Sequence, residues 1–362
     1  MGFRDNGESP ITGLIMIHSP DIETHWQALA RFAQKTPSPH NTQPFRLRIV
    51  DRTHADVIFL PRRGLWVADP LGRFTWLTAG IFVEICTIAA HSLGYEVDAE
   101  FDHSPMYPSG DVETPQVVAR LTLHHRGEPI PDLPADLILK RHTSRLPYDG
   151  SICPPEILDE LKAEAKRLGH AFETRIDAEA IRWVVELNKQ ALFHDLDNDD
   201  LRTELIKWLR FDAREEDLLN DGLSARCLTF NGRLLRSFFL QHRFWTLPGV
   251  RNVVGTVYGA TMKGIGTIGW LRGRYVDSAD WVAAGQVMIR LWLLLTRHGF
   301  YWHPYGSVIT SEDARRNMID YLKLPTETGG EDMVWLLLRL GRSKEPPISR
   351  RLPVHDILLC GR

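Results

Sequence analysis

The sequence has few of the residues and motifs that several large classes of protein require. Its four cysteines, Cys86, Cys153, Cys227 and Cys360, are far apart, form no CxxC pair and lack histidines at zinc-ligand spacing. No GxSxG, HExxH or GKS/GKT sequence occurs, so neither hydrolase nor zinc chemistry is indicated. We therefore expect reduced thiols and no metal site.

An excess of one charge and a long apolar run are also missing. The formal net charge is -3 and the basic residues are scattered, which does not favour a nucleic acid or a membrane surface as partner. The apolar run near the N-terminus is too short for a signal peptide. The most apolar predicted helix, residues 281–295, includes Gln286 and Arg290 and is shorter than the roughly 20 apolar residues of a membrane span. We expect a cytoplasmic protein with a small-molecule substrate.

Helical and strand patterns alternate along the whole chain, so the expected fold class is α+β. Predicted helices cover residues 21–34, 73–93, 154–168, 178–193, 200–209, 280–297 and 311–322. Predicted strands cover residues 45–50, 55–60, 116–123, 170–175 and 333–341. A further short helix is predicted to start near Pro134 and to end in the sequence KRHTSR.

A soft boundary near residue 130 divides the chain into a first half, 1–130, and a second half, 131–362. Residues 217–274 are rich in glycine and large aromatics, and we expect them to form a lid-like insertion. The alternative is an ordinary packed helical excursion. The aromatic residues expected to wall a pocket are Phe230, Phe238, Phe239, Phe244 and Trp245. The sequence GIGTIG at 264–269 matches GxGxxG, but no predicted strand precedes it, so we expect a flexible loop.

The sequence PSPHNTQP at 37–44 has more hydrogen-bonding groups than a simple chain reversal needs. Three prolines stiffen it and a strand follows it directly. Its hydroxyl and amide side chains, at Ser38, Asn41 and Gln43, predict a surface that contacts the edge of a flat polar ligand.

Two basic clusters predict an anion site. In RHTSR, Arg141 and Arg145 would share one face of a helix, and with Thr143 between them they could bind a phosphate. The alternative is a solvated helix end, where cations suit the helix dipole. The second cluster, SRRLP, contains Arg350 and Arg351, and its alternative is a surface tail.

These segments resemble the FMN-dependent nitroreductase-fold proteins, and in particular their long, single-chain Acg-like branch. The patterns P-S-x-x-N-x-Q-P at 37–44 and R-x-[ST]-x-R at 141–145 are typical of the family. Further segments fit the branch in the same order, namely DPLGR at 69–73, TELIKWLR at 203–210, DGL at 221–223, DWVAAGQVMIRLWLLLTRHG at 280–299 and LLRLGRS at 337–343. The resemblance covers roughly residues 20–360, apart from the insertion.

The resemblance implies a nitroreductase-like fold in which two related halves form a pseudo-dimer within one chain, with one complete FMN site. A monomer is then expected, with a homodimer as the alternative. The loop would hydrogen-bond to the flavin ring edge or be held against it, and the basic clusters would bind the phosphate. The implied cofactor-binding residues are Pro37, Ser38, Asn41, Gln43, Arg141, Thr143, Arg145, Tyr305, Gly306, Arg350 and Arg351.

The activity that the resemblance implies is hydride transfer through flavin N5, between NAD(P)H and a small aromatic or apolar acceptor. No side chain in the sequence stands out as a general acid, so no catalytic residue is assigned. One alternative is a flavin-dependent dehydrogenase or oxidase of a specialised metabolite. Another is a non-catalytic, flavin-sequestering protein, and a third is an interaction protein that uses the aromatic insertion as its contact surface.

Overall fold

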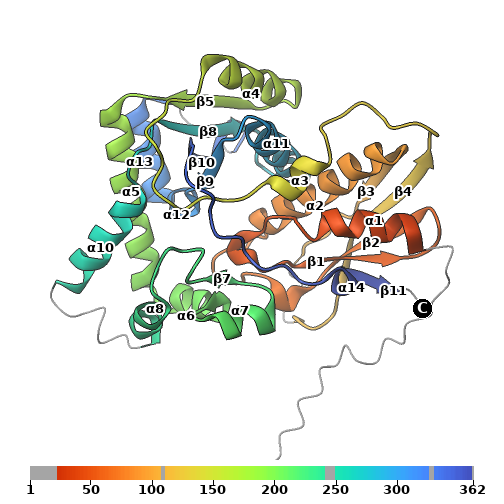
Figure 1. Cartoon of the computed structure of the whole chain (residues 1–362), viewed down its shortest axis with the longest axis horizontal. Coiled ribbons are helices and arrows are strands. Elements are labelled where there is room, and N and C mark those ends of the chain that lie inside the picture. The colour runs from red at the N-terminus through yellow and green to blue at the C-terminus, as the bar shows by residue number, and fades with distance from the viewer. Residues whose placement is uncertain (1–22, 107–110, 241–248, 326–329, 361–362) are drawn as a thin grey trace, which may run out of the picture.

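The chain folds around two mainly antiparallel sheets, as Figure 1 shows. A computed structural model describes residues 23–106, 111–240, 249–325 and 330–360. The first sheet has the order β11-β1-β2-β4-β3 and consists of β1 (Phe45–Ile49), β2 (His54–Phe59), β3 (Tyr95–Phe101), β4 (Gln116–His125) and β11 (Leu358–Cys360). The second has the order β5-β8-β10-β9 and consists of β5 (Ala171–Arg175), β8 (Thr267–Gly273), β9 (Tyr301–Pro304) and β10 (Met333–Gly341). The expected α+β class is confirmed.

The same order of elements occurs twice along the chain. In the first half, α1 (Glu23–Ala33) precedes β1 and β2, and α2 (Arg73–Ser92) separates them from β3 and β4. In the second half, α4 (Pro155–Arg167) precedes β5 and β8, and α11 (Ser278–Arg297) separates them from β9 and β10. Each set of four strands has the same spatial order, first-second-fourth-third. The C-terminal strand β11 pairs in parallel with β1, so the end of the chain belongs to the first sheet.

The two long helices, α2 and α11, pack against each other between the sheets. A Cβ atom at Gly80 would lie 2.1 Å from the carbonyl oxygen of Val282, and one at Gly285 would lie 2.0 Å from that of Leu77. Glycine at these two positions therefore permits the close approach. Within the described residues, α2 is the helix whose length and composition would suit a membrane span, but 83% of that apolar window is buried inside the protein.

A long excursion connects β5 to β8 in the second half. It contains α5 (Ala178–Asp197), α6 (Asp199–Trp208), β6 (Leu209–Arg210), α7 (Ala213–Leu219), β7 (Leu223–Ser224), α8 (Gly232–Leu240) and α10 (Val250–Thr261). Phe230 and Phe239 pack against a small separate core that includes Leu209 and Phe211. Phe230 and Phe239 therefore fit the alternative of an ordinary packed excursion. Phe244 and Trp245 lie outside the described residues.

Two predictions about this region are wrong: that the insertion extends to residue 274, and that GIGTIG at 264–269 is a flexible loop. β8 lies within the expected insertion, yet it pairs with both β5 and β10 inside the second sheet. A Cβ atom at Gly264 would lie 1.9 Å from the carbonyl oxygen of Tyr148, and one at Gly266 would lie 2.3 Å from that of Ser151. These glycines permit close backbone packing beside a core strand, which is why the segment is glycine-rich.

The remaining elements are short or follow β9. They are α3 (Asp136–Lys140), α12 (Gly306–Thr310), α13 (Glu312–Leu322), α14 (Val354–Ile357) and two 3-10 turns, Pro39–Asn41 and Pro61–Arg63. The seven long predicted helices and the five predicted strands each coincide with an observed element, although β3, β8 and β9 were not predicted. The short predicted helix ends at Lys140, before the two arginines of RHTSR.

Candidate functional site

The 36–44 loop, which connects α1 to β1, has an uncommon backbone. His40, Asn41 and Gln43 have φ angles of 50°, 54° and 50°, in the left-handed region that side chains other than glycine seldom adopt. Ser38 fixes the turn, because its Oγ accepts a hydrogen bond of 2.9 Å from the Gln43 backbone N–H. Strain of this kind persists only where surrounding contacts over-determine the conformation, and it is often found at functional sites.

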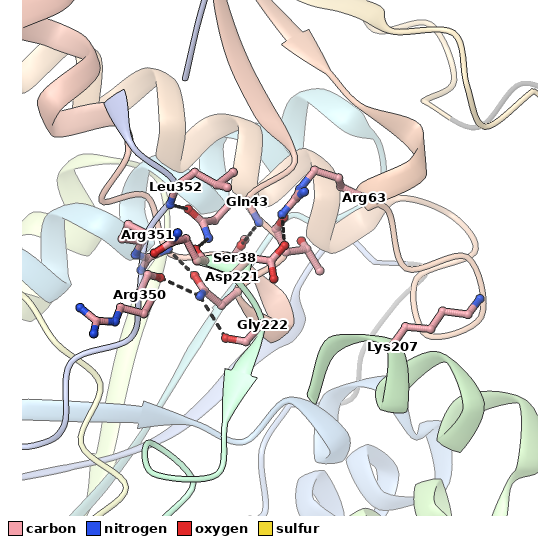
Figure 2. Close-up of polar contacts among 12 residues, drawn as sticks. Ser38, Gln43, Arg63, Lys207, Asp221, Gly222, Arg350, Arg351 and Leu352 are labelled. Atoms are coloured by element: carbon pink, nitrogen blue, oxygen red, sulfur yellow. Dashed lines mark hydrogen bonds and ion pairs between the residues drawn. The ribbon is translucent and has the colours of Figure 1, made fainter. Parts of the chain in front are cut away.

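Asn41 connects the loop to two distant segments of the chain, whose residues Gly222, Arg350 and Arg351 are labelled in Figure 2. Its Nδ2 donates to the carbonyl oxygens of Gly222 and Arg350, both at 3.0 Å. Its Oδ1 accepts a hydrogen bond of 2.6 Å from Nη1 of Arg351. The amide is buried and its partners come from the excursion and from the C-terminal tail, so Asn41 joins three parts of the chain at one point.

Gln43 makes the same kind of connection one step further along the loop. Its Nε2 donates to the carbonyl oxygen of Asn220 at 3.0 Å, and its Oε1 accepts from the Leu352 backbone N–H at 2.9 Å. Figure 2 shows Gln43 beside Leu352 of the tail. The sequence left two roles open for these amides, contact with the edge of a flavin ring or support of the loop. Their hydrogen bonds fit the second role, support of the loop.

Asp221 organises the other side of the loop. Its carboxylate accepts from Nε of Arg210 at 3.0 Å and is also paired with Nη2 of Arg63. Arg63 in turn donates from Nε to the carbonyl oxygen of Thr42 at 2.6 Å. The DGL sequence therefore supplies a buried carboxylate that fixes Arg63, and Arg63 fixes the loop backbone.

The RHTSR segment is not helical, so Arg141 and Arg145 do not share one helix face as expected. Arg141 has a ψ of 122°, and Thr143 forms a parallel bridge with Trp302 of β9. A helix would hold the two side chains close together, whereas an extended chain of four residues can span up to about 13 Å. The solvated helix end is also excluded for Arg141, which is 5% exposed. The bridge to β9 replaces the helical hydrogen bonds.

A first cation cluster consists of Lys35, Arg141, His142 and Arg351, from the end of α1, the RHTSR segment and the tail. Burial and the neighbouring Arg351 lower the pKa of Arg141 to about 9, and burial lowers the pKa of Arg351 to about 10. Burial, then Arg141 and Arg351, lower the pKa of His142 to about 4. Burial and the same two arginines also lower the pKa of Lys35.

The first cation cluster lacks a carboxylate partner in the part of the chain that the structure describes. Arg141 donates to the carbonyl oxygen of Lys35 at 3.3 Å and lies 4.3 Å from the ring centroid of Trp292, while its Nε is shielded from solvent without a partner. Arg351 donates to the Thr36 carbonyl oxygen at 2.8 Å besides Asn41. Buried cations without counter-charge are costly unless an anion joins them. The cluster therefore fits a phosphate-sized anion.

A second cation cluster, at the other end of RHTSR, consists of Arg145, Arg339, His40 and His303. Arg339 is fully buried in β10 opposite His303 of β9, and it donates to the carbonyl oxygen of Leu146 at 3.2 Å. Burial and Arg145 lower the pKa of His40 to about 4, and burial, Arg145 and Arg339 lower that of His303 well below its ordinary value. Both imidazoles are therefore neutral at pH 7, and within the described part of the chain the Nδ1 of each lacks a hydrogen-bond partner.

The turn after β9 closes the second cluster. Tyr305 is 1% exposed, and its hydroxyl donates to the sulfur of Met262 at 3.5 Å. Gly306 begins α12, and a Cβ atom added there would meet nothing within 4 Å. The expected site residue Tyr305 is thus packed into the core, while Gly306 faces open space.

The two arginines of the tail have different roles. Arg351 belongs to the first cation cluster, whereas Arg350 is exposed and pairs with Asp217 of α7 at 2.5 Å. Figure 2 shows the Arg350 side chain directed away from the 36–44 loop. The structure thus brings together Ser38, Asn41, Gln43, Arg141 and Arg351, and it does not bring the Arg350 guanidinium to them.

Sequence reasoning missed Lys35, His40, Asp221 and Arg339, and it gave His303 only as the start of a turn, 303–306, that the resemblance implies to lie near the flavin. For Arg339 a signal existed, because it is the one charged residue in the otherwise apolar strand MVWLLLRLG. A charged residue within a fully buried strand needs partners or a function. For the two histidines no local pattern distinguishes them, since their importance comes from the fold that brings them to Arg145.

Comparison with known sequences finds a short region of similarity. No family model matches the chain. Two relatives, from two strains of Mycobacterium tuberculosis, are 38% identical over 79 residues, and each has the name "Putative NAD(P)H nitroreductase". The match covers 22% of this chain and 22% of each relative, so the chain spans about a fifth of the length of the curated relatives that it matches.

Solved structures that resemble the chain have nitroreductase names too. A nitroreductase-like family protein from Bacillus cereus is 14% identical, with a TM-score of 0.34 over 61% of this chain and 92% of that one. A nitroreductase with bound FMN from Bacteroides fragilis is 11% identical, with a TM-score of 0.35 over 60% and 92%. The FMN-dependent nitroreductase NfnB from Mycobacterium smegmatis, in complex with NADPH, is 15% identical, with a TM-score of 0.33 over 57% and 86%. The sequence relatives thus have the nitroreductase name of the family that the loop and arginine motifs resemble.

Proposed function

We propose that this chain is an FMN-dependent oxidoreductase of the nitroreductase type, with NADH or NADPH as hydride donor. One observation carries the proposal: the 36–44 loop of the first half meets Arg141 and Arg351, two cations that have no carboxylate partner among the described residues. FMN has both a flat ring and a phosphate, and a phosphate monoester carries about -1.5 to -2 charges at neutral pH. The nitroreductase names of the relatives support the same proposal.

The first cation cluster is suited to hold the phosphate. Arg141 has a free Nε donor, and Lys35 and Arg351 add charge from two other segments. Hydrogen bonds from a cation to a phosphate oxygen are stronger than those between neutral groups, and the hydroxyl of Thr143 would add one more donor. From there the ring would lie along the extended segment towards Arg145 and the turn at Tyr305 and Gly306.

When bound, FMN supplies the hydride chemistry, accepting hydride at N5 from NAD(P)H and passing it to a small aromatic or apolar acceptor. The residues of the chain bind and orient the reactants. Tyr305 keeps solvent out on one side, and the open space at Gly306 leaves room for a flat ligand. None of the described residues is assigned as a proton donor, so protons would come from water or from the acceptor.

We also propose that the two halves form a pseudo-dimer with one FMN site per chain, so that a monomer is sufficient. The repeated order of elements supports this, because α1-β1-β2-α2-β3-β4 has the same arrangement as α4-β5-β8-α11-β9-β10. The loop that connects α1 to β1 has a much shorter counterpart between α4 and β5, formed by residues 168–170. Among the described residues the second half thus has no second copy of the loop, and we expect one FMN site per chain.

A non-catalytic, flavin-sequestering protein is the second candidate, and one observation favours it. The loop is fastened by hydrogen bonds to the excursion at Asn220 and Gly222 and to the tail at Arg350 and Leu352. A flavin held beneath such a fastened loop would be shielded from a second substrate. The two candidates differ in whether bound flavin reacts with NAD(P)H.

The test is the visible spectrum of the purified protein, recorded before and after NADPH or NADH is added without oxygen. The oxidoreductase proposal predicts a flavin spectrum that bleaches. A flavin spectrum that persists would support sequestration. A colourless protein that cannot be loaded with FMN would contradict both candidates. R141M is the matched variant, and it should lose the flavin while keeping the fold.

A further inference from the structure

The two amides of the 36–44 loop are already engaged within the chain. Asn41 gives both hydrogens of its amide to backbone carbonyls, and its oxygen accepts from Arg351. Gln43 donates to Asn220 and accepts from Leu352. For either amide to contact a ligand, at least one of these buried bonds would have to break. The ligand-facing group of the loop is therefore a different residue.

His40 is the residue of the loop that has the opposite properties. Its imidazole is half-buried, and its Nδ1 is shielded from solvent without a hydrogen-bond partner among the described residues. Its backbone has a φ of 50°, which costs free energy for a side chain with a Cβ. A buried imidazole nitrogen without a partner is also unfavourable. A ligand that accepts from or donates to Nδ1 would offset this cost.

The surroundings of His40 indicate which end of the ligand it would meet. Arg145 lies close enough to His40 and to His303 to lower the pKa of both imidazoles, after burial, which is the larger cause. Thr143 bridges Trp302, which places Arg145 beside the end of β9 where His303 lies. This is the end of RHTSR away from Arg141 and the proposed phosphate position.

We propose that His40, and not Asn41 or Gln43, is the residue of the 36–44 loop that contacts the flavin ring system, through Nδ1. The inference rests on the proposed FMN site. Arg145 and His303 complete the ring-end subsite, because Arg145 brings a guanidinium and His303 brings a second neutral imidazole, whose Nδ1 has no hydrogen-bond partner among the described residues. Asn41 and Gln43 then act as scaffold residues that hold the loop in the conformation that presents His40.

Three substitutions separate the contact from the backbone conformation. H40G removes the imidazole and is compatible with a positive φ, so it tests the contact without adding backbone strain. H40N keeps an amide atom bonded to Cγ, where Nδ1 stands, and Asn tolerates the left-handed region. H40Q places its amide one bond further out, where Nε2 stands. His54, the first residue of β2, is paired with Asp51 and provides the matched control H54N away from the site.

The experiment compares FMN with riboflavin, which lacks the phosphate, by quenching of flavin fluorescence on titration with each purified variant. We expect H40G to weaken both flavins by the same factor, about tenfold, because the contact is to the ring. H40N should recover most of this loss, whereas H40Q should not. R141A should weaken FMN strongly and riboflavin little, and H54N should bind both as the wild type does.

Two results would overturn the inference alone. In one, wild-type protein binds both flavins and H40G binds them equally well. In the other, H40G weakens FMN but not riboflavin, which would place His40 at the phosphate end. Wild-type protein that binds neither flavin would reject the proposed function, and the inference with it. The two failures are therefore distinguishable.

Discussion

Two groups of buried arginine in this molecule have opposite electrostatic surroundings. Arg290 of α11 donates to the carboxylates of Glu84, Asp132 and Glu164 at 2.7, 2.6 and 2.5 Å. Burial would lower its pKa, but the hydrogen bonds that it donates to these three carboxylates raise that pKa well above its ordinary value. Arg141 has no such partners among the described residues, and burial lowers its pKa to about 9.

The presence or absence of carboxylate partners distinguishes an arginine that stabilises the fold from one that is suited to bind an anionic ligand. Arg290 joins α11 to α2, to the segment before α3 and to α4, so its charge is neutralised by the fold itself. The first cation cluster also gathers residues from distant segments, but every charge in it is positive. An arrangement of this second kind is stable only at a cost, and an anionic ligand is what would remove that cost.

The largest expected effect is that of breaking the paired arrangement. R290M leaves the buried Glu84 without its cation, while Asp132 keeps His91 and Glu164 keeps Arg167. Because a buried carboxylate loses its partner, we expect the free energy of unfolding to fall by about 3–5 kcal/mol. Equilibrium unfolding in urea measures this loss. R297A on the same helix is the control, because Arg297 and its partner Glu160 are partly exposed and such pairs are worth about 1 kcal/mol or less. Equal losses for R290M and R297A would contradict the assignment of Arg290 as structural.

The unpaired arrangement should respond in the opposite way. R141M removes a buried cation that has no counter-charge, so the unfolding free energy of the flavin-free protein should change much less than in R290M. FMN affinity should fall by about 2–3 kcal/mol, or about 30- to 150-fold in Kd, because a charged hydrogen bond to phosphate is lost. Fluorescence titration measures the affinity. A variant that loses stability and keeps its flavin affinity would show that Arg141 is structural after all.

The two groups should also differ in their response to pH. Burial, with repulsion from nearby arginines, lowers the pKa of His142 and of His40 to about 4, against about 6.5 in the unfolded chain. Below pH 6.5 the unfolded chain therefore binds more protons, and the free energy of unfolding decreases as pH falls towards 4. The expected slope is about 1 kcal/mol per pH unit for each histidine. Urea unfolding at several pH values measures it, and the double variant H40N/H142N should have a shallower slope.

Two of the three carboxylates around Arg290, Asp132 and Glu164, have lowered pKa values and respond in a lower pH range, whereas burial raises the pKa of Glu84. A hydrogen bond from Arg167, opposed by burial, and a second one from Arg290 lower the pKa of Glu164 to about 2. A carboxyl group with a lowered pKa contributes stability that is present above its unfolded value and is lost only as pH falls towards 2. A stability loss between pH 6.5 and 4.5 that survives in H40N/H142N would show that other groups cause it.

Much of the fold could be predicted because its helices and strands have strong local patterns. The helix at 73–93 is apolar over its whole length, and the structure buries it between the sheets as α2. The strand β8 was missed because its sequence, TIGWLRG, is interrupted by glycine and follows a glycine-rich stretch. The reason for those glycines, close packing on the backbone of Tyr148 and Ser151, is a tertiary contact that no local pattern reveals.

The site could be predicted in its motifs but not in the roles within them. PSPHNTQP and RHTSR indicate the two segments, and in the structure Asn41 of the first lies against Arg351, which shares the first cation cluster with Arg141 of the second. The helical spacing of Arg141 and Arg145 was misleading, because the bridge of Thr143 to Trp302 replaces the helical hydrogen bonds. Which side chain of the loop remains unpartnered depends on contacts across more than 170 residues of sequence, such as that of Gln43 with Asn220.

The smallest expected effect concerns two neighbouring arginines of the tail. Arg350 is exposed and pairs with Asp217, so R350A should change the unfolding free energy by about 0.5 kcal/mol or less and FMN affinity by no more than about twofold. R351A removes a cation of the first cluster and the bond to Asn41, so it should weaken FMN by more than about tenfold. Titration of both variants at low and high salt measures the contrast, because an exposed pair is screened and a buried one is screened much less. If R350A weakened FMN binding as much as R351A does, the basic tail as a whole would hold the phosphate. The distinction between paired and unpaired arginines would then fail for these two residues, which are neighbours in the sequence.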